Sequence, residues 1–490
     1  MSDLMDPKRE LAPEWPASAE STEAGAASNL KESGGKPRRP SYLTRNLTTG
    51  SIAGNLWLLS WPQMIEATLS VVDQLADLLW AGSLGAVAIA GLGVAQTYTQ
   101  LIQMIRRGLD LALRAMVARA VGAGKTDLAN HAALQGLTLS IVYLVVLCSA
   151  GVAITNGLLK VIGVSDAVRA EGVLYMRVQF VAVGIMGLRI TGAAILQSAG
   201  DSVTPMKAVV TSRILHIVLS PFFVFGWLGV PSLGLAGLAL ANSVAQLVGC
   251  WMTYVPLFRG ESRLHLRVRE YRIDLALCWR LLKLGLPACV AQAERGFAQI
   301  LLIAFVAPFG NVALAAYSIA KRIEVLAHAG NMGFGQASGT LIGQNLGAGY
   351  PHRAKQTLVW ALIYGSLLNT ALGVMVICFP TPILMLFNQE AELVSLGTVW
   401  LQIMGLAFIF MGPSFVFQQS FNIAGDTMAP LLITLIGFWG FQIPLAWLLP
   451  SFTGLGVYGI PWAILISMVV RITLFVYYSF SGRWLNAKVI

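Results

Sequence analysis

Charged residues are scarce in this chain of 490 residues: Asp, Glu, Lys and Arg make up only 11% of it, against about 25% in soluble globular proteins. Hydrophobic residues make up 56%, and the mean hydropathy is +0.70. This composition excludes an ordinary soluble protein. Apolar runs of about 20 residues, the length that crosses a bilayer core, recur along most of the chain. We therefore predict an all-α polytopic membrane protein.

Motifs of several functional classes are also missing. The five cysteines form no CxxC pair, which argues against a disulfide framework or a metal site. We find no HExxH, no GxSxG and no phosphate-binding glycine loop, so we expect neither an enzyme nor a cofactor. The net charge of +10 is better explained by the orientation of membrane helices than by nucleic-acid binding.

The first 50 residues are polar, and no apolar core follows Asp3, Asp6, Lys8 and Arg9. This is not the pattern of a secretory signal, and it predicts a disordered cytoplasmic tail over residues 1–50. Behind the tail we predict about twelve membrane helices. The spans are Leu56–Ala81, Ala86–Leu109, Ala132–Ile154, Tyr175–Leu196, Met206–Phe225, Leu235–Tyr254, Leu284–Val306, Val312–Ala337, Thr357–Phe379, Val399–Phe421, Leu431–Leu449 and Val457–Tyr478.

The second six spans repeat the first six. Trp61-Pro62 recurs as Leu286-Pro287, Gly122-Ala123-Gly124 as Gly347-Ala348-Gly349, and Gly200-Asp201 as Gly425-Asp426, always 225 positions later. Six spans per copy make the repeats parallel, a plan typical of transporters with a substrate site between the copies. We predict an N-lobe over 51–257, a basic cytoplasmic linker over 258–283 and a C-lobe over 284–490.

Lys and Arg gather on alternate connections, which predicts that both termini are cytoplasmic. The linker carries Arg259, Arg263, Arg267, Arg269, Arg272, Arg280 and Lys283. The connections on the other side are nearly free of basic residues, with Lys160 and Arg169 as the exceptions. We read the linker as a topology determinant, and binding of anionic lipid is the alternative.

The repeated motifs resemble those of the multidrug and toxin extrusion (MATE) family of secondary antiporters. The most specific match, LIGQNLGAGYPHRA, begins at Leu341, and its partner VARAVGAGKTDLA begins at Val117. Further matches begin at Val72 (VDQLADLLWAGSLGAVAIAG), Leu196 (LQSAGDSVTPM) and Phe421 (FNIAGDTMAP). The resemblance covers about residues 55–480. It implies an exporter of organic, often cationic, compounds in the inner (plasma) membrane of the cell, and it implies a monomer.

An ionisable residue in mid-membrane is costly and marks a pathway by default. Asp77 occupies the place where the family resemblance implies an acidic residue for proton or cation coupling. Asp73 lies one helical turn earlier on the same face, and its structural alternative is an ion pair with a lysine or arginine.

Three further residues extend this predicted ion-coupling site. Several family members carry Asn and Asp where this chain has His216 and Ser220, and Asn242 aligns with a small polar residue of the same site. Imidazole titrates near neutral pH, so the substitution favours protons over sodium. Arg213, on the same helical face, would disfavour a protonated His216. A hydrogen-bonded interior histidine is the structural alternative.

For the substrate cavity the candidates are Glu294, Arg295 and Gln299. Many family members carry a glutamate in this span, and that position aligns with Arg295. Glu294 lies one residue earlier, so its side chain points about 100° away from the position of the family glutamate. Glu294 could still attract a cation, and Arg295 could pair with a carboxylate across the lobes. We read two charged clusters, Arg106–Arg114 and Lys321–Glu324, as paired charges that position helices, with gating as the alternative.

Other readings remain open at this point. A lipid-linked saccharide flippase of the same superfamily would need cationic residues to converge in its cavity. Arg177, Arg189, Arg213, Arg295 and Arg471 are spread over four spans, and the sequence does not show that they meet. Sodium-coupled efflux is the other alternative.

Overall fold

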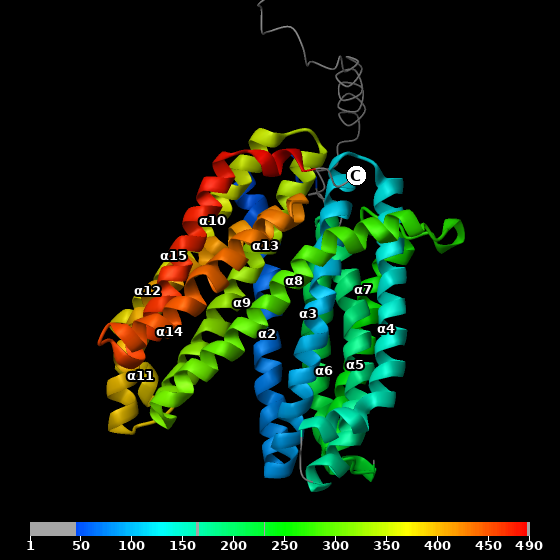
Figure 1. Ribbon diagram of the computed structural model, residues 1–490. Coiled ribbons are helices and arrows are strands. Elements are labelled where there is room, and N and C mark those ends of the chain that lie inside the picture. The colour runs from blue at the N-terminus through cyan, green and yellow to red at the C-terminus, as the bar shows by residue number, and fades with distance from the viewer. Residues whose placement is uncertain (1–45, 163–165, 230, 488–490) are drawn as a thin grey trace, which may run out of the picture. The chain divides into compact units, whose positions relative to one another are not determined.

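The computed structural model describes residues 46–162, 166–229 and 231–487, and these residues form helices and connections without a strand. Twelve long helical segments dominate (Figure 1). They are α2 (Ile52–Ser83), α3 (Ala86–Gly122), α4 (Thr126–Ile162), α5 (Asp166–Ala199), α6 (Val203–Phe225), α7 (Leu235–Arg259), α8 (Leu275–Val306), α9 (Asn311–Gly347), α10 (Pro351–Cys378), α12 (Ala391–Ala424), the run of α13 (Met428–Leu435), η4 (Ile436–Gln442) and α14 (Ile443–Phe452), and α15 (Gly459–Phe480). The predicted all-α class is confirmed.

Each predicted span falls on one of these segments, because a chain in lipid must satisfy its backbone hydrogen bonds internally. Nine of the described helices are long and apolar enough to cross a membrane. The helices α2, α3 and α9 are not among these nine. They carry Glu66, Asp73 and Asp77, the cluster around Arg106, and the cluster around Lys321. Each of these three helices thus carries several ionisable residues.

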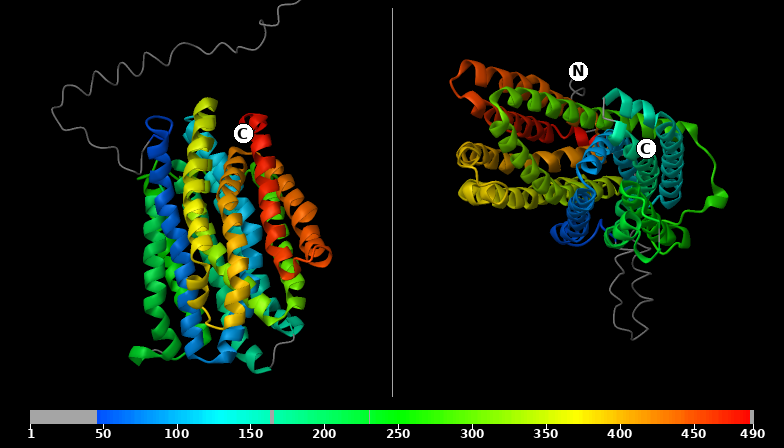
Figure 2. Two further views of the ribbon diagram at one scale, coloured as in Figure 1. Left: turned by 90° about the vertical axis from the view of Figure 1, so that its left-hand side faces the viewer. Right: turned by 90° about the horizontal axis from the view of Figure 1, so that it is seen from below.

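Successive helices run in opposite directions, so their connections fall at two ends (Figures 1 and 2). We call one end the linker end. It carries the connections 123–125, 200–202, 260–274, 348–350 and 425–427. The opposite end carries 84–85, 226–229, 231–234, 307–310, 379–390 and 453–458, including the short helix α11 (Pro380–Met385).

Two predicted segments differ from the structure or lie beyond it. The tail over 1–50 lies outside the described residues as far as residue 45, and Ser51 caps α2 by accepting a hydrogen bond from the Gly54 N–H (3.3 Å). The non-helical linker is shorter than 258–283, because α8 already begins at Leu275. Asp274 caps that helix by accepting from the Leu277 N–H at 3.0 Å, and this bond lowers the pKa of the Asp274 carboxyl.

Helices of the two predicted lobes pack directly on each other. The helix α2 packs against α9 as well as α6, and α3 packs against α8 as well as α4 and α5 (Figure 2). The glycine motifs lie at this contact. A Cβ on Gly122 would lie 2.0 Å from the Gln344 carbonyl oxygen, and one on Gly347 would lie 2.1 Å from that of Arg119. Only glycine permits so close an approach of two backbones.

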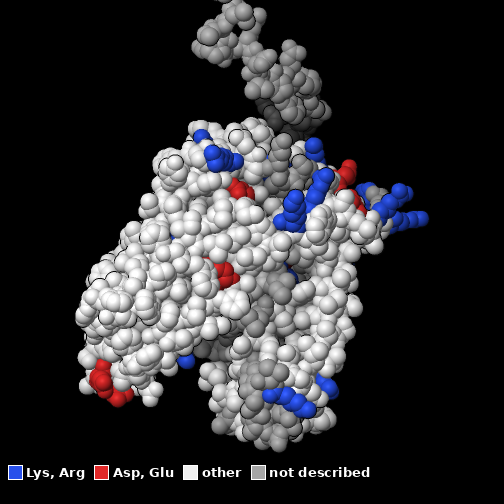
Figure 3. Space-filling view, viewed as in Figure 1, with Lys and Arg blue, Asp and Glu red and all other residues white. Residues whose placement is uncertain are grey.

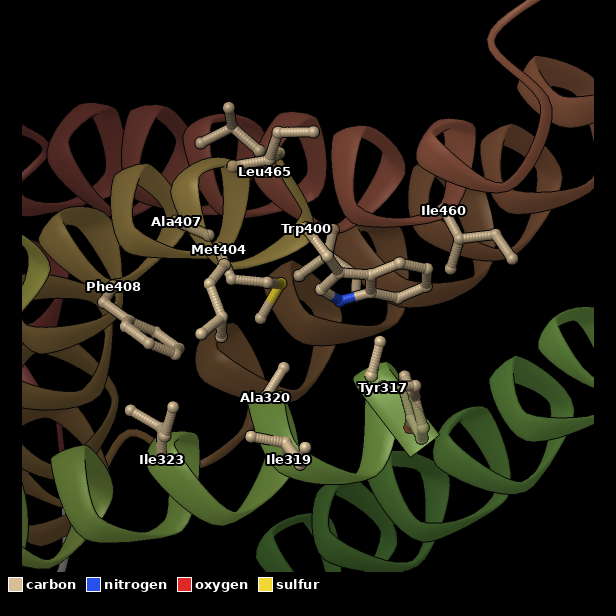
Figure 4. Close-up of a cluster of buried hydrophobic side chains, with 14 of the residues drawn as sticks. Tyr317, Ile319, Ala320, Ile323, Trp400, Met404, Ala407, Phe408, Ile460 and Leu465 are labelled. Carbon is tan, nitrogen blue, oxygen red and sulfur yellow. The ribbon is translucent and has the colours of Figure 1, made fainter. Parts of the chain in front are cut away.

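The largest buried apolar cluster lies in the C-terminal half. Trp400, Met404 and Phe408 of α12 face Ile319 and Ile323 of α9 (Figure 4). Further side chains from α15 complete it, among them Ile460 and Leu465. This core packs α9, α12 and α15 against one another, and the same helices carry part of the lining of the C-terminal cavity described below.

Candidate functional site

Two helices bring four ionisable side chains together in the N-terminal half, and we call these the α2–α6 cluster: Asp73, Asp77, Arg213 and His216. Asp73 and Asp77 lie one turn apart on α2, and Arg213 and His216 lie three residues apart on α6, so each pair shares a helix face. The helices α2 and α6 pack together, which turns the two faces toward each other.

Asp73 is the centre of the cluster. One carboxylate oxygen accepts from Arg213 Nη1, and the other lies 2.8 Å from His216 Nδ1. Asp73, Arg213 and His216 are all buried. A buried carboxylate requires such partners, because an unpaired charge in a low-dielectric interior is costly. The ion pair that formed the structural alternative for Asp73 is therefore present, with Arg213 as its partner.

Asp77 meets the other side of the same imidazole. Its Oδ1 atom lies 3.6 Å from His216 Nε2, just beyond hydrogen-bond distance. Neither atom has a hydrogen-bond partner in the described structure. Since the ionised Asp73 carboxylate can only accept, Nδ1 carries its hydrogen in the neutral ring. With the ring neutral and Asp77 ionised, Nε2 would present a lone pair to Asp77, and two acceptors would face each other.

Ser220 and Asn242 do not join this arrangement. The Ser220 hydroxyl donates to the His216 carbonyl of its own helix at 2.7 Å. Asn242 Oδ1 accepts from Gln246 Nε2 at 3.2 Å, and Gln246 in turn accepts from Arg189. Asn242 therefore belongs to a separate polar chain between α5 and α7. The structure brings together Asp73, Asp77 and His216 from the predicted ion-coupling set.

A second buried network contains a residue that the sequence reasoning missed. Glu66, also on α2, accepts from Gln197 Nε2 at 3.0 Å, and Arg114 donates to the Oε1 atom of the same glutamine at 2.6 Å. Earlier on α3, Arg106 pairs with Asp110 at 2.9 Å. Glu66 could have been found by the criterion that singled out Asp73, since it too is an ionisable residue inside a predicted span.

In the C-terminal half, polar groups line a small cavity of about 60 Å³. Arg295 and Gln299, both predicted as cavity residues, line it together with Lys321, Gln418 and others from α9, α12, η4 and α15. Glu294 is not part of this lining. It is buried beside α13, where one carboxylate oxygen lies 3.4 Å from the Thr434 hydroxyl. Although Glu294 and Arg295 are adjacent in α8, their side chains therefore lie in different surroundings.

The two charged clusters contain intrahelical ion pairs. Arg106 pairs with Asp110, and Lys321 pairs with Glu324 at 2.8 Å. Within the part of the chain that the structure describes, no group of three His, Cys, Asp or Glu side chains could hold a metal ion. On the face shown in Figure 3, Lys and Arg gather mainly toward the upper end, a smaller group lies near the lower end, and the broad middle is nearly free of them.

Comparison with known proteins places these features in context. A sequence model of the MatE family matches residues 62–222 and 287–448, two segments whose starts are 225 positions apart. The probable multidrug resistance protein YoeA of Bacillus subtilis is 25% identical over 90% of this chain and 96% of its own length. The probable multidrug resistance protein NorM of Thermotoga maritima is 25% identical over 87% of this chain and 92% of its own.

A solved structure shows the same fold. A MOP superfamily transporter from Pyrococcus furiosus superposes with a TM-score of 0.83 at 21% identity, covering 92% of this chain and all of the other.

Proposed function

Because this chain belongs to the MatE family and is a multi-pass membrane transporter, we propose that it is a secondary antiporter that exports organic compounds in exchange for protons. The names of its relatives support drug-like cargo. The two predicted lobes, 51–257 and 284–490, would alternate between inward and outward openings. The observation that carries proton exchange is the unpaired contact between Asp77 and His216 in the α2–α6 cluster.

This contact can hold one proton. With His216 neutral, the two carboxylates and the Arg213 guanidinium leave the cluster with one negative charge. A proton taken up between Asp77 Oδ1 and His216 Nε2 would neutralise the cluster and replace two facing acceptors by a hydrogen bond. The cluster would then contract, since 3.6 Å exceeds the usual donor–acceptor distance. Loading and unloading would thus favour different packings of α2 on α6.

The same geometry argues against sodium as the coupling ion. Sodium is a hard cation, and like other hard cations it requires several oxygen ligands. Asp73 already binds Arg213 and His216, so neither of its oxygens is free for a metal ion. The Ser220 hydroxyl and the Asn242 amide point to other partners. Only Asp77 keeps an unused carboxylate oxygen in this cluster.

We also propose an orientation in which the linker end is cytoplasmic, with both termini inside and the protein acting as a monomer in the plasma membrane. The linker end carries Arg259, Arg269 and Arg272 of the basic connection. Basic connections remain on the cytoplasmic side during insertion. The concentration of blue side chains near one end in Figure 3 agrees with this orientation.

Everted membrane vesicles with an imposed proton gradient test the exchange. A pH-sensitive dye reports the gradient while organic cations and anions are added one at a time. We expect at least one compound to dissipate the gradient with the wild-type protein and not with Asp77→Asn. Asp127→Asn, at an exposed position in the first turn of α4, is the matched control and should behave as wild type. Uptake driven only by a sodium gradient would contradict the proton assignment.

A further inference from the structure

The C-terminal cavity is built from side chains that suit an anion. Its polar lining consists mainly of Arg295 and Gln299 from α8, Lys321 from α9, Gln418 from α12, Gln442 from η4 and Arg471 from α15, and it also includes Glu324, His328 and Ser414. Amide groups can turn their NH₂ side toward a negative ligand. Five helical segments that are distant in sequence therefore converge on one small polar space. Two of the arginines that the sequence left scattered, Arg295 and Arg471, meet here.

Neither of these two arginines has a carboxylate partner. Arg295 donates to the neutral Gln418 side chain at 2.8 Å, and the Arg471 guanidinium lies 4.5 Å from the Phe438 ring centroid. Arg471 is only 4% exposed. Among the described residues, neither arginine forms an ion pair, and both Nε atoms lack an acceptor. Arg471 is buried and Arg295 is half-buried, and their hydrogen bonds go to the neutral groups of Met468 and Gln418. Buried guanidinium groups are normally paired with an opposite charge, so the two free Nε donors point to a missing acceptor.

The surrounding charges do not supply that acceptor. Glu324 is the acidic residue of the cavity lining, and Glu294 lies outside that lining. Glu324 already pairs with Lys321 inside the cavity. In the cavity lining, three basic side chains (Arg295, Lys321 and Arg471) thus stand against one acidic side chain, Glu324. The cavity carries an excess of positive charge that would repel a cation.

We infer that this cavity binds the anionic group of an organic anion, a carboxylate or a phosphate, between Arg295 and Arg471. Guanidinium groups match both anions through paired N–H donors. The inference rests on the proposed transport function and names its class of cargo. It replaces the cationic cargo that the family resemblance implies with an anionic one.

The size of the cavity limits what enters it. A volume of about 60 Å³ is far below the roughly 300–1,000 Å³ of pockets that enclose a whole drug-sized ligand. That space admits the charged group alone, so the rest of the cargo must lie outside the cavity as the structure stands. Met411, Phe415 and Met468 form part of the apolar lining. Methionine adapts to ligands of varied shape, which suits an apolar or aromatic body next to the charged group.

Binding to the purified protein in lipid nanodiscs tests the inference. The anionic probes are carboxyfluorescein, 1-naphthoate and naphthyl phosphate, and the cationic probes are ethidium and tetraphenylphosphonium. We expect wild type to bind an anionic probe, and Arg295→Gln or Arg471→Gln to weaken it about tenfold or more, the usual scale for a lost charged hydrogen bond. Arg471→Lys should retain part of the affinity. Arg322→Gln, an exposed neighbour of Lys321 outside the cavity, should change nothing.

The outcomes separate this inference from the proposed function. Proton-coupled transport of ethidium or tetraphenylphosphonium in proteoliposomes, without binding of any anionic probe, would overturn the anion site and leave the antiporter standing. Transport of neither class would overturn the antiporter, and binding of an anionic probe in that case would still support the anion site. Unchanged anion affinity in both arginine variants would also refute the site.

If Arg471→Gln elutes as aggregate, Lys321→Gln and Arg471→Lys are measured in its place. Displacement of the probe by a polyprenyl diphosphate would assign the anion to a lipid phosphate, and displacement only by soluble carboxylates would assign it to a soluble cargo.

Discussion

Asp73 and Asp77 are one helical turn apart on α2, yet their partners give them different tasks. Asp73 holds Arg213 and His216 in a buried cluster, whereas Asp77 has an oxygen without a partner. Removing one member of a buried ion pair leaves an uncompensated charge, which costs roughly 3–5 kcal/mol. We therefore expect Asp73→Asn to lower the free energy of unfolding by about 3 kcal/mol, and Asp77→Asn to leave it nearly unchanged. Thermal denaturation of the detergent-solubilised protein measures both.

A double variant gives this prediction its control. In Asp73→Asn with Arg213→Met, the guanidinium that would be left unpaired is gone, so much of the lost stability should return. If Asp73→Asn alone melts as wild type does, the ion pair contributes nothing to the fold and the division of tasks between the two aspartates is wrong.

The sequence predicts such a site only in part. Residue spacing alone puts Asp73 and Asp77 on one face of α2, and it does the same for Arg213 and His216 on α6. The sequence does not show that these two faces meet, because this depends on how α2 packs on α6. Asn242 shows the limit, because its partner Gln246 is set by neighbouring helices and not by a motif. Arg295 and Arg471 lie in spans far apart in sequence, and only the folded C-terminal half shows that they share a cavity.

At the scale of the helices, regular spans follow from hydropathy and irregular ones do not. The bilayer requires unbroken helices of about 20 residues, which explains why the predicted spans coincide with observed helices. The π-helical turn at Ile436–Gln442 has no such signal. It brings Phe438 and Gln442 to the cavity and accommodates Arg471, since a Cβ on Gly437 would lie 2.2 Å from Arg471 Cγ. Turns of this kind occur often at functional sites.

The helices α3 and α9 meet at the linker end through glycine, and this contact is open to test. A Cβ on Gly122 would lie 2.0 Å from a backbone oxygen of α9, and overpacking of this kind costs roughly 1–3 kcal/mol. We expect Gly122→Ala to shift the population about tenfold away from the state in which this end is closed. Spin labels at positions 125 and 350, on either side of the contact, should report longer distances.

The matched control for this substitution is Gly157→Ala. Gly157 lies within α4, and a Cβ there would meet nothing within 4 Å, so the distance between labels should stay as in wild type. An unchanged distance in Gly122→Ala as well would mean that the two helices are not held by the glycine contact.

At the scale of the whole molecule, the charge pattern and the glycine contact between the halves both bear on which end faces the cytoplasm. The linker end carries the basic connections, and there Gly122 and Gly347 bring the halves into direct contact. If basic connections lie inside, the structure is closed toward the cytoplasm. Its cargo would then leave by the opposite end, as export requires.

Labelling in intact cells decides the orientation. In a variant without native cysteines, we would introduce cysteine in place of Arg269, exposed at the linker end, or Asn388, exposed at the opposite end. A membrane-impermeant maleimide should label Asn388→Cys in intact cells and reach Arg269→Cys only after the membrane is permeabilised. Labelling of Arg269→Cys alone would invert the topology. The closed end would then face outward, and the proposed cytoplasmic termini and the direction of cargo release would both be wrong.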